Sequence, residues 1–221
     1  MRARSRRLRY PALYALVALT AFVLIIAWYA VAHRAVAPLG VIRPVDSHDH
    51  IRGSGDVRLI IYMDLRCVHC QHLDTVDLPR IEKTYPDRLQ IVYRNLPLEG
   101  IHPGATLAAE AAECVARTGG SAAYWKFVHA AYQPAQGRVF DAVWFAAAAA
   151  SVGAPTHAYA QCIERGEGKA AIARDLTDAT RAAFTLTPTI VVEKGERQIV
   201  VEGDSYTRIV AAIELLINGY E

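Results

Sequence analysis

The longest apolar run of the chain lies near its N-terminus. Residues from Pro11 to Ala32 include no charged side chain. A helix of these 22 residues would be about 33 Å long, close to the roughly 30 Å hydrocarbon core of a bilayer. The apolar core of a cleaved signal peptide has only about 7–15 residues. The run therefore predicts a transmembrane anchor over residues 11–32. Small-x-small cleavage sites at Ala30-Val31-Ala32 and Ala35-Val36-Ala37 keep a cleaved signal open as the alternative.

Five arginines and no acidic residue precede this run in residues 1–9. Positively charged flanks stay on the cytoplasmic side of a membrane. The pattern predicts a cytoplasmic tail over residues 1–10 and a single pass through the inner (cytoplasmic) membrane, with the remaining domain facing the periplasm or the cell exterior. Residues 33–50 mix Pro, Gly, Ser and charge without periodicity, which is typical of a linker.

Beyond residue 50, short β-branched runs alternate with helical spacing. Val57–Met63 and Leu89–Tyr93 are nearly continuous apolar runs of the length of buried strands. Between them, four apolar residues are spaced for one face of a helix that ends near Tyr85-Pro86: Leu73, Val76, Leu78 and Ile81. A strand–helix–strand unit implies two parallel strands.

The second half of the chain begins with an Ala-rich segment over about residues 103–183, which predicts three or four helices. Residues 189–192 and 198–202 predict a β-hairpin around Lys194-Gly195-Glu196, and Tyr206–Ile217 predicts a closing helix. The fold class is therefore α/β. We expect a mixed central sheet flanked by helices over residues 51–221, with an all-helical subdomain at about 103–183.

Composition and charge exclude two classes of protein, disordered chains and nucleic-acid-binding proteins. Of the 221 residues, 53% are hydrophobic, which excludes a disordered chain. Without the five N-terminal arginines, the 24 Lys and Arg fall to 19 against 22 Asp and Glu. A body with this charge lacks the basic surface of nucleic-acid-binding proteins.

The chemistry centres on Cys67-Val68-His69-Cys70, which follows a buried strand and opens a helix. Unpaired N–H groups at a helix N-terminus stabilise an anion there, and such positions lower a cysteine pKa from about 8.5 to roughly 3.5–7. Cys67 is therefore the expected nucleophile. His69 could add a hydrogen bond or a positive charge to its thiolate. Cys70, three residues along, is the less exposed partner that resolves the mixed disulfide.

Four cysteines in an oxidising compartment suggest disulfides and permit three pairings. The simplest division is one redox pair, Cys67 and Cys70, and one structural pair, Cys114 and Cys162. Metal binding is the rival interpretation, because Cys67, Cys70 and His72 could supply ligands. A structural zinc site usually needs a fourth ligand. We interpret His48-Asp49-His50 as a solvated turn.

Ile61–Cys70 resembles the active-site strand and turn of DsbA-like thiol–disulfide oxidoreductases of the thioredoxin-fold superfamily. The resemblance covers roughly residues 51–218, and in that family a helical block is inserted into the thioredoxin core. Six further segments follow the family's order: Ile51-Arg52-Gly53, Tyr93-Arg94-Asn95-Leu96-Pro97-Leu98, His102-Pro103, Ala111-Ala112-Glu113-Cys114, Tyr124-Trp125-Lys126-Phe127-Val128-His129 and Thr187-Pro188-Thr189.

The resemblance assigns further site residues. Thr187 and Pro188 match the cis-proline loop, which lies against the C-x-x-C and pairs with the substrate backbone; Val68 joins them as a substrate-binding residue. Val68 stands where many members have Pro, so the redox potential does not follow from the likeness. Asp64 matches an acidic position that could relay a proton from Cys70. His102 is interpreted as a turn or packing residue.

The resemblance also supports a structural Cys114–Cys162 disulfide, because some relatives have a second disulfide in the helical block. Closing a loop of 48 residues would be worth about 4 kcal/mol in the chain-entropy model.

The expected function is oxidation of thiols in folding proteins by a monomer that needs no cofactor and no metal. Reoxidation by a DsbB-like or other quinone-linked membrane partner is implied by the resemblance alone. Two rivals remain. One is a thiol reductase for a specific client such as an apocytochrome, and the other is a copper metallochaperone that binds copper at Cys67 and Cys70.

Overall fold

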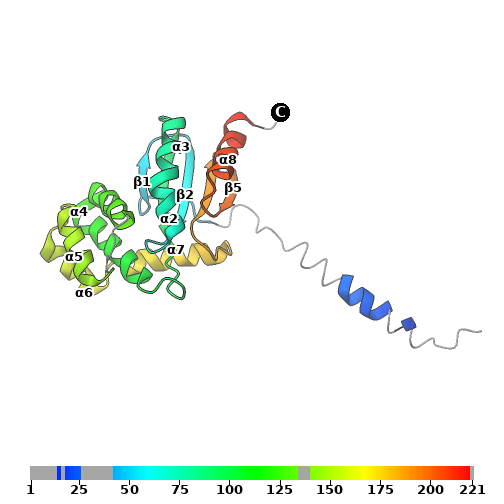
Figure 1. Cartoon of the computed structure of the whole chain (residues 1–221), viewed down its shortest axis with the longest axis horizontal. Helices are drawn as coiled ribbons and strands as arrows, with labels where there is room; N and C mark the ends of the chain where they lie inside the picture. The colour runs from blue at the N-terminus through cyan, green and yellow to red at the C-terminus, as the bar shows by residue number, and fades with distance from the viewer. Residues whose placement is uncertain (1–13, 16–17, 26–41, 134–139, 220–221) are drawn as a thin grey trace, which may run out of the picture. The chain divides into compact units, whose positions relative to one another are not determined.

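The computed structural model describes residues 14–15, 18–25, 42–133 and 140–219 (Figure 1). The chain divides into two units, residues 1–38 and 39–221. In the first unit, residues 14–15 and 18–25 are helical, and the rest of the predicted anchor at 11–32 lies outside the described residues. None of the helices in the described segments is both long and apolar enough to cross a membrane.

The core of the second unit is a mixed five-stranded sheet of order β1-β3-β2-β4-β5. Its strands are β1 (His50–Gly53), β2 (Val57–Met63), β3 (Leu89–Asn95), β4 (Thr189–Lys194) and β5 (Arg197–Glu202). Strands β2 and β3 are parallel, and β4 and β5 form an antiparallel hairpin, which confirms both predicted pairings. Strand β1, which pairs antiparallel with β3, was not predicted because four residues without alternation carry little signal.

Helices surround the sheet and fill the insertion between β3 and β4. They are α2 (Val68–His72), the π-helix η1 (Leu73–Asp77), α3 (Leu78–Thr84), α4 (Ala105–Tyr132), α5 (Ala142–Ser151), α6 (Thr156–Arg165), α7 (Lys169–Arg181) and α8 (Tyr206–Asn218). Helix α4 is interrupted at Gly120, whose positive φ of 81° suits glycine. Helices α4 to α7 form the predicted helical block, so the predicted thioredoxin fold with a helical insertion is confirmed.

The alternation of side chains along β2 assigns the helices to the two faces of the sheet. Leu59 and Ile61 belong to the larger core cluster, which includes Leu78 and Ile81 of α3 and Ile209 and Ile213 of α8. Ile60 and Tyr62 belong to the smaller cluster, with Ala179 of α7. The β2 strand is therefore buried on both faces, which explains its continuous apolar sequence.

The predicted apolar face of the first helix is wrong at one position. Val76 is 41% exposed, whereas Leu73, Leu78 and Ile81 are buried. The π-helix η1 over Leu73–Asp77 changes the helical phase, because its turns are wider than those of an α-helix. Asp74 and Asp77 are buried instead of Val76.

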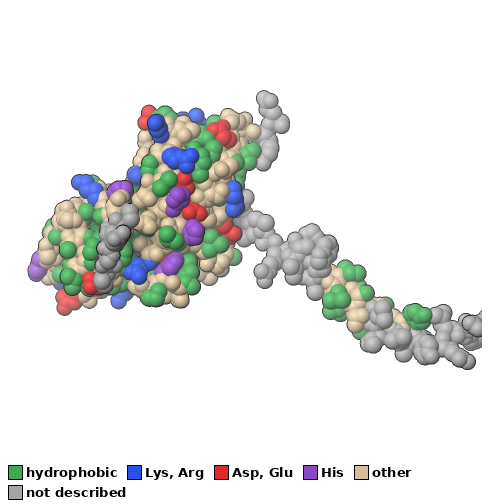
Figure 2. All heavy atoms as spheres, viewed as in Figure 1, with side chains coloured by type: hydrophobic (Ala, Val, Ile, Leu, Met, Phe, Trp, Pro, Cys, Tyr) green, Lys and Arg blue, Asp and Glu red, His purple; other side chains and the backbone are tan. Residues whose placement is uncertain are grey.

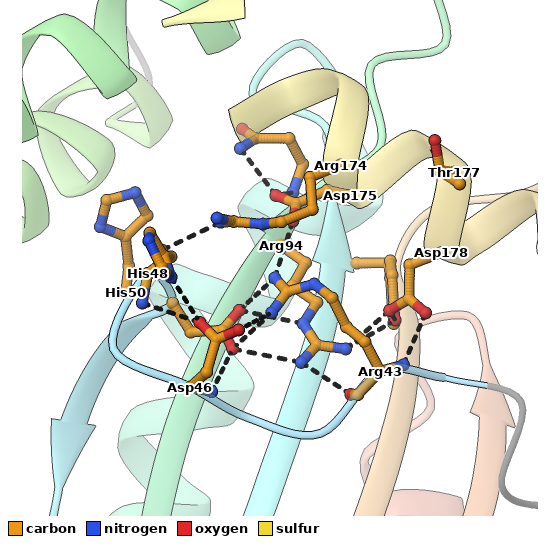
Figure 3. Close-up of polar contacts among 12 residues, drawn as sticks. Arg43, Asp46, His48, His50, Arg94, Arg174, Asp175, Thr177 and Asp178 are labelled. Atoms are coloured by element: carbon orange, nitrogen blue, oxygen red, sulfur yellow. Dashed lines mark hydrogen bonds and ion pairs between the residues drawn. The ribbon is translucent and has the colours of Figure 1, made fainter. Parts of the chain in front are cut away.

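Residues 42–50, which the sequence places in the linker, pack against the domain. Ile42 is buried, and Arg43 contacts two carboxylates of α7, through its backbone N–H to Asp178 (2.6 Å) and its side chain to Asp175 (2.9 Å) (Figure 3). The solvated-turn interpretation of His48-Asp49-His50 is wrong for its last two residues. The side chain of Asp49 is fully buried against Arg43 and Arg94, and His50 Nε2 lies 3.0 Å from Glu113.

A disulfide joins Cys114 of α4 to Cys162 of α6, with 5.7 Å between the Cα atoms. Both residues are buried, and the bond closes a 48-residue loop within the helical block. The bond links two helices that pack together, and its cysteines lie far from Cys67 and Cys70 in the sequence.

Removing this bond by a double Cys114→Ala, Cys162→Ala substitution is expected to lower the free energy of unfolding by about 3 kcal/mol, since measured disulfide contributions are commonly below the chain-entropy value. Chemical denaturation of the oxidised domain would measure the loss. Cys67 and Cys70 should still exchange disulfides at the wild-type rate. A loss below about 1 kcal/mol would contradict a structural role for the bond.

Candidate active site

The Cys67–Cys70 pair sits where β2 ends and α2 begins. An Asx turn at Asp64 bends the chain there, because the Asp64 carboxylate accepts the Arg66 N–H at 2.7 Å. The Asp64 carbonyl also accepts the Cys67 N–H at 3.0 Å. Cys67 is the N-cap of α2 and has an extended backbone. Its sulfur therefore lies beside N–H groups of the first helical turn that have no partner within the helix.

Hydrogen bonding makes Cys67 acidic. The pKa of Cys67 is lowered to about 5 by hydrogen bonds, above all from the Cys70 thiol, then from Thr187 and from the backbone N–H groups of Cys70 and His69, while burial opposes the shift. In the thiol form, Sγ donates to the Thr187 carbonyl at 3.4 Å. At neutral pH Cys67 is a thiolate, which is the nucleophilic form of cysteine.

The pKa of Cys67 gives a pH profile. Alkylation of the reduced protein by iodoacetamide is expected to reach half its maximal rate near pH 5, against about 8.5 for an unfolded cysteine. The Cys70→Ala variant is the matched test, because it removes the largest stabilising hydrogen bond and should move the midpoint upward. A wild-type midpoint near pH 8 would contradict the site geometry.

The same shift links pH to stability. Because the folded pKa lies below the unfolded one, ionised Cys67 stabilises the reduced protein fully above about pH 8.5, and this contribution is lost as pH falls through about 5.

The pKa of Cys70 is shifted in the opposite direction to that of Cys67. Complete burial raises the pKa of Cys70 well above its ordinary value, and the neighbouring Cys67 sulfur raises it further. The backbone N–H of Asp64 lies 3.5 Å from Cys70 Sγ. The two sulfurs are both free in this structure, so it represents the reduced dithiol. One ionised thiol and one protonated thiol side by side are the requirements of thiol–disulfide exchange.

Asp64 and His69 contact the two sulfurs through their backbone N–H groups, but their side chains bond to other residues. The Asp64 side chain is fully buried, and its carboxylate accepts from the backbone N–H groups of Arg66 and Leu98 and from His102. The His69 ring is 65% exposed and pairs with Asp204 at 3.2 Å. The side-chain contact expected between His69 and the Cys67 thiolate is therefore replaced by a contact from the His69 backbone N–H.

The cis-proline loop lies against Cys67. The Thr187–Pro188 peptide bond is cis, both residues are buried, and the Pro188 carbonyl accepts the Gly203 N–H at 2.8 Å. Two apolar residues that are sequence neighbours of Cys67 and Thr187 are open to solvent, Val68 at 65% and Leu186 at 37%. The rim of the site therefore combines a reactive sulfur with apolar surface. Figure 2 shows basic, acidic and hydrophobic side chains interspersed over the face in view.

Two residues with a place in the site were not identified as functional from the sequence. His102 Nδ1 lies 2.7 Å from the Asp64 carboxylate, and its position before Pro103 had suggested only a turn. The Tyr132 hydroxyl at the end of α4 donates to the Asp64 carbonyl at 3.1 Å, which ties the helical block to the active-site turn. No spacing in the sequence connects residue 132 with residue 64.

The three ligands of the rival metal-binding interpretation do not assemble into a site in the described part of the chain. His72 is 52% exposed and faces Asp77, with 3.5 Å between His72 Nε2 and the carboxylate. Among the residues that the structure describes, no group of three or more His, Cys, Asp or Glu side chains could hold a metal ion.

Comparison with known proteins identifies the family. A family model described as thioredoxin matches residues 48–214. The Na(+)/H(+) antiporter NhaA 1 of Mycolicibacterium gilvum is 35% identical over 94 residues, which are 41% of this chain and 15% of that protein. NhaA 3 of Salinispora tropica is 36% identical over 88 residues, 38% of this chain and 12% of that protein. The matched regions thus span only a small part of these curated relatives.

Solved structures match over most of the domain. Oxidised BdbD from Bacillus subtilis has a TM-score of 0.69 at 19% identity and covers 80% of this chain and 97% of its own. The α-DsbA1 protein of Wolbachia pipientis has a TM-score of 0.67 at 19% identity, covering 79% and 93%. A thioredoxin-like oxidoreductase from Silicibacter pomeroyi has a TM-score of 0.66 at 24% identity, covering 79% and 95%. At these identities the matches establish the shared fold.

Proposed function

Because this chain belongs to the thioredoxin family, we propose that it is an extracytoplasmic thiol–disulfide oxidase that forms disulfides in folding proteins. The observation that carries the proposal is the difference between the two thiols. The pKa of Cys67 falls to about 5, and the pKa of buried Cys70 rises.

The reaction begins with the Cys67–Cys70 disulfide. A substrate thiolate attacks Cys67 Sγ, the bond between the cysteines breaks, and Cys70 leaves with the electron pair and takes up a proton. A second substrate thiolate then attacks the substrate sulfur of the mixed disulfide and displaces Cys67. The substrate is oxidised to a disulfide and the protein is reduced to a dithiol. Cys70 acts as the attacking group in the reverse direction.

The low pKa of Cys67 favours the oxidising direction. A thiolate of low pKa is a good leaving group, and its stabilisation makes the reduced protein the more stable form. Electrons therefore pass from substrate to protein, which is the behaviour of an oxidant.

The rim of the site supports a protein substrate. Val68 follows Cys67 in the chain and Leu186 precedes Thr187, and both are exposed apolar residues. Such surface suits extended apolar segments that a folded protein would bury. In this proposal Thr187 and Pro188 align the substrate chain beside the sulfur.

The proposal includes a place and a partner. The uncharged apolar run at residues 11–32 and the arginines before it support a single-pass anchor in the inner membrane, with the domain in the periplasm or outside the cell. Each turnover leaves a dithiol, so a reoxidant is needed. We assign this role to a DsbB-like or other quinone-linked membrane protein, and we expect the oxidase to act as a monomer.

The reduction potential of the Cys67/Cys70 couple tests the direction of electron flow. Equilibration with glutathione buffers is expected to give a value near about −120 mV, as for strong oxidants. A value at or below about −270 mV would make the protein a reductase instead. If the pair shows no reversible couple, the redox function is wrong and copper binding becomes the function to test.

A further inference from the structure

The mechanism does not use the pairing of His102 with Asp64. We propose that His102 is a positioning residue for Cys70, acting through the carboxylate of Asp64. The inference rests on the proposed function, because it concerns the reactivity of the buried thiol of the same pair.

The Asp64 carboxylate is held by three donors. One oxygen accepts the Arg66 N–H at 2.7 Å, and the other accepts both the Leu98 N–H at 2.9 Å and His102 Nδ1 at 2.7 Å. A carboxylate oxygen accepts hydrogen bonds and an imidazole N–H donates them, so we assign Nδ1 of His102 as the donor. Two of the three donors are backbone groups, which leaves His102 as the side chain that completes the set.

Asp64 also contacts the buried thiol directly. Its backbone N–H lies 3.5 Å from Cys70 Sγ, so the same residue that receives the His102 hydrogen bond also supplies a hydrogen bond to the sulfur. Among the described residues, the titratable ones that interact with Cys70 are Cys67, Tyr132 and, through its backbone N–H, Asp64. Among these, the carboxylate of Asp64 is the one that His102 contacts.

Losing the His102 donor should make Cys70 less reactive for two reasons. The Asp64 carboxylate becomes less firmly held, which loosens the N–H contact that stabilises a Cys70 thiolate. The carboxylate charge is also less compensated, and an uncompensated negative charge opposes ionisation of a nearby thiol. Both effects reduce the thiolate fraction of Cys70. Cys67 keeps its donors, because Cys70 stays protonated and still donates to it, as do the backbone N–H groups of Cys70 and His69.

A two-phase reaction with Ellman's reagent separates the two sulfurs. In the reduced protein, the Cys67 thiolate attacks the reagent disulfide and releases the first thionitrobenzoate. Cys70 then loses its proton to solvent and attacks Cys67 Sγ, which forms the Cys67–Cys70 disulfide and releases the second thionitrobenzoate. Stopped-flow absorbance follows both releases, and the second phase reports Cys70 alone.

Three variants of the full chain test the role of the donor. The His102→Ala variant is expected to slow the second phase about tenfold at neutral pH, with an unchanged first phase, and to move the pH profile of the second phase upward. The His102→Asn variant keeps a donor near the Nδ1 position and should restore the wild-type rate. The His102→Gln variant places its donor further along the side chain and should be slow, and it replaces His102→Ala if that variant does not fold.

Equal second-phase rates in the wild type and in the His102→Gln and His102→Ala variants would overturn the inference. A slow second phase in the His102→Asn variant would do the same, because it would exclude the Nδ1 hydrogen bond as the cause. In an Asp64→Asn background, His102→Ala should add no further slowing if His102 acts through the carboxylate. Absence of the first phase in the wild type would instead contradict the proposed function.

Discussion

Replacing Cys67 with Ser is expected to abolish thiol–disulfide exchange. The hydroxyl of serine cannot form the mixed disulfide, and at neutral pH it is not ionised, so both the nucleophile and the leaving group are lost. The substitution changes one buried atom at the N-cap of α2, and serine is a favoured N-cap residue. The variant should therefore stay folded. Its melting temperature should lie below that of the reduced wild type at neutral pH, because the stabilising Cys67 thiolate is missing, and should approach it as pH falls through about 5.

The assay is oxidation of a peptide that contains two thiols, followed by mass spectrometry. Cys70→Ser is the matched control, because it leaves Cys67 free to form a mixed disulfide but removes the internal thiol that would resolve it. Mixed with a peptide dimer joined by one disulfide, this variant should attack that disulfide through Cys67 and release one peptide as a thiol. The other peptide should accumulate as an adduct at Cys67 on non-reducing gels. Exchange that persists in the Cys67→Ser variant, or a peptide adduct at Cys70 of that same variant, would show that the wrong sulfur has been assigned as nucleophile.

The parts of the fold that could be predicted are those with a local signal. The strand over Val57–Met63 is buried on both faces, so its sequence is continuously apolar. Thr187-Pro188 was placed against the Cys67–Cys70 pair by the resemblance, and the structure has the sulfur of Cys67 3.4 Å from the Thr187 carbonyl.

The parts that could not be predicted depend on contacts between distant residues. His102 meets Asp64 across 38 positions, and Asp49 meets Arg94 across 45. Neither pair has a spacing that helical or strand periodicity could reveal. The π-helix at Leu73–Asp77 is a local event without a residue signature, and it was enough to expose Val76.

The buried ion network of Arg94 has the largest expected effect on stability. The Arg94 side chain is fully buried and lies 3.0 Å from Asp49 and 2.8 Å from Asp178. It also donates to the carbonyls of Arg43 and Pro44, so it ties the segment before β1 to the sheet and to α7 (Figure 3). Burial opposes ionisation of Asp49, but hydrogen bonds from Arg94 and Arg43 outweigh it and lower the pKa of Asp49.

Replacing Arg94 with Met is expected to lower the free energy of unfolding by about 5 kcal/mol, because it leaves two buried carboxylates without their shared cation. Urea denaturation at neutral pH would measure the loss. Arg58→Met in β2 is the control: Arg58 is 45% exposed and pairs with Glu193, so the change should stay below about 1 kcal/mol.

The pH dependence distinguishes lost charge compensation from lost packing. In the wild type, the depressed pKa of Asp49 contributes stability that is lost as pH falls through that pKa. In the Arg94→Met variant, Asp49 keeps Arg43 but loses Arg94, the larger of the two hydrogen-bond donors that lower its pKa, so the pKa of Asp49 rises. The stability difference between the two proteins should therefore narrow on acidification from pH 7 to 5. If the difference between the two proteins is the same at both pH values, Arg94 stabilises the domain by filling space, and the ion network is not what holds residues 42–50 to the domain.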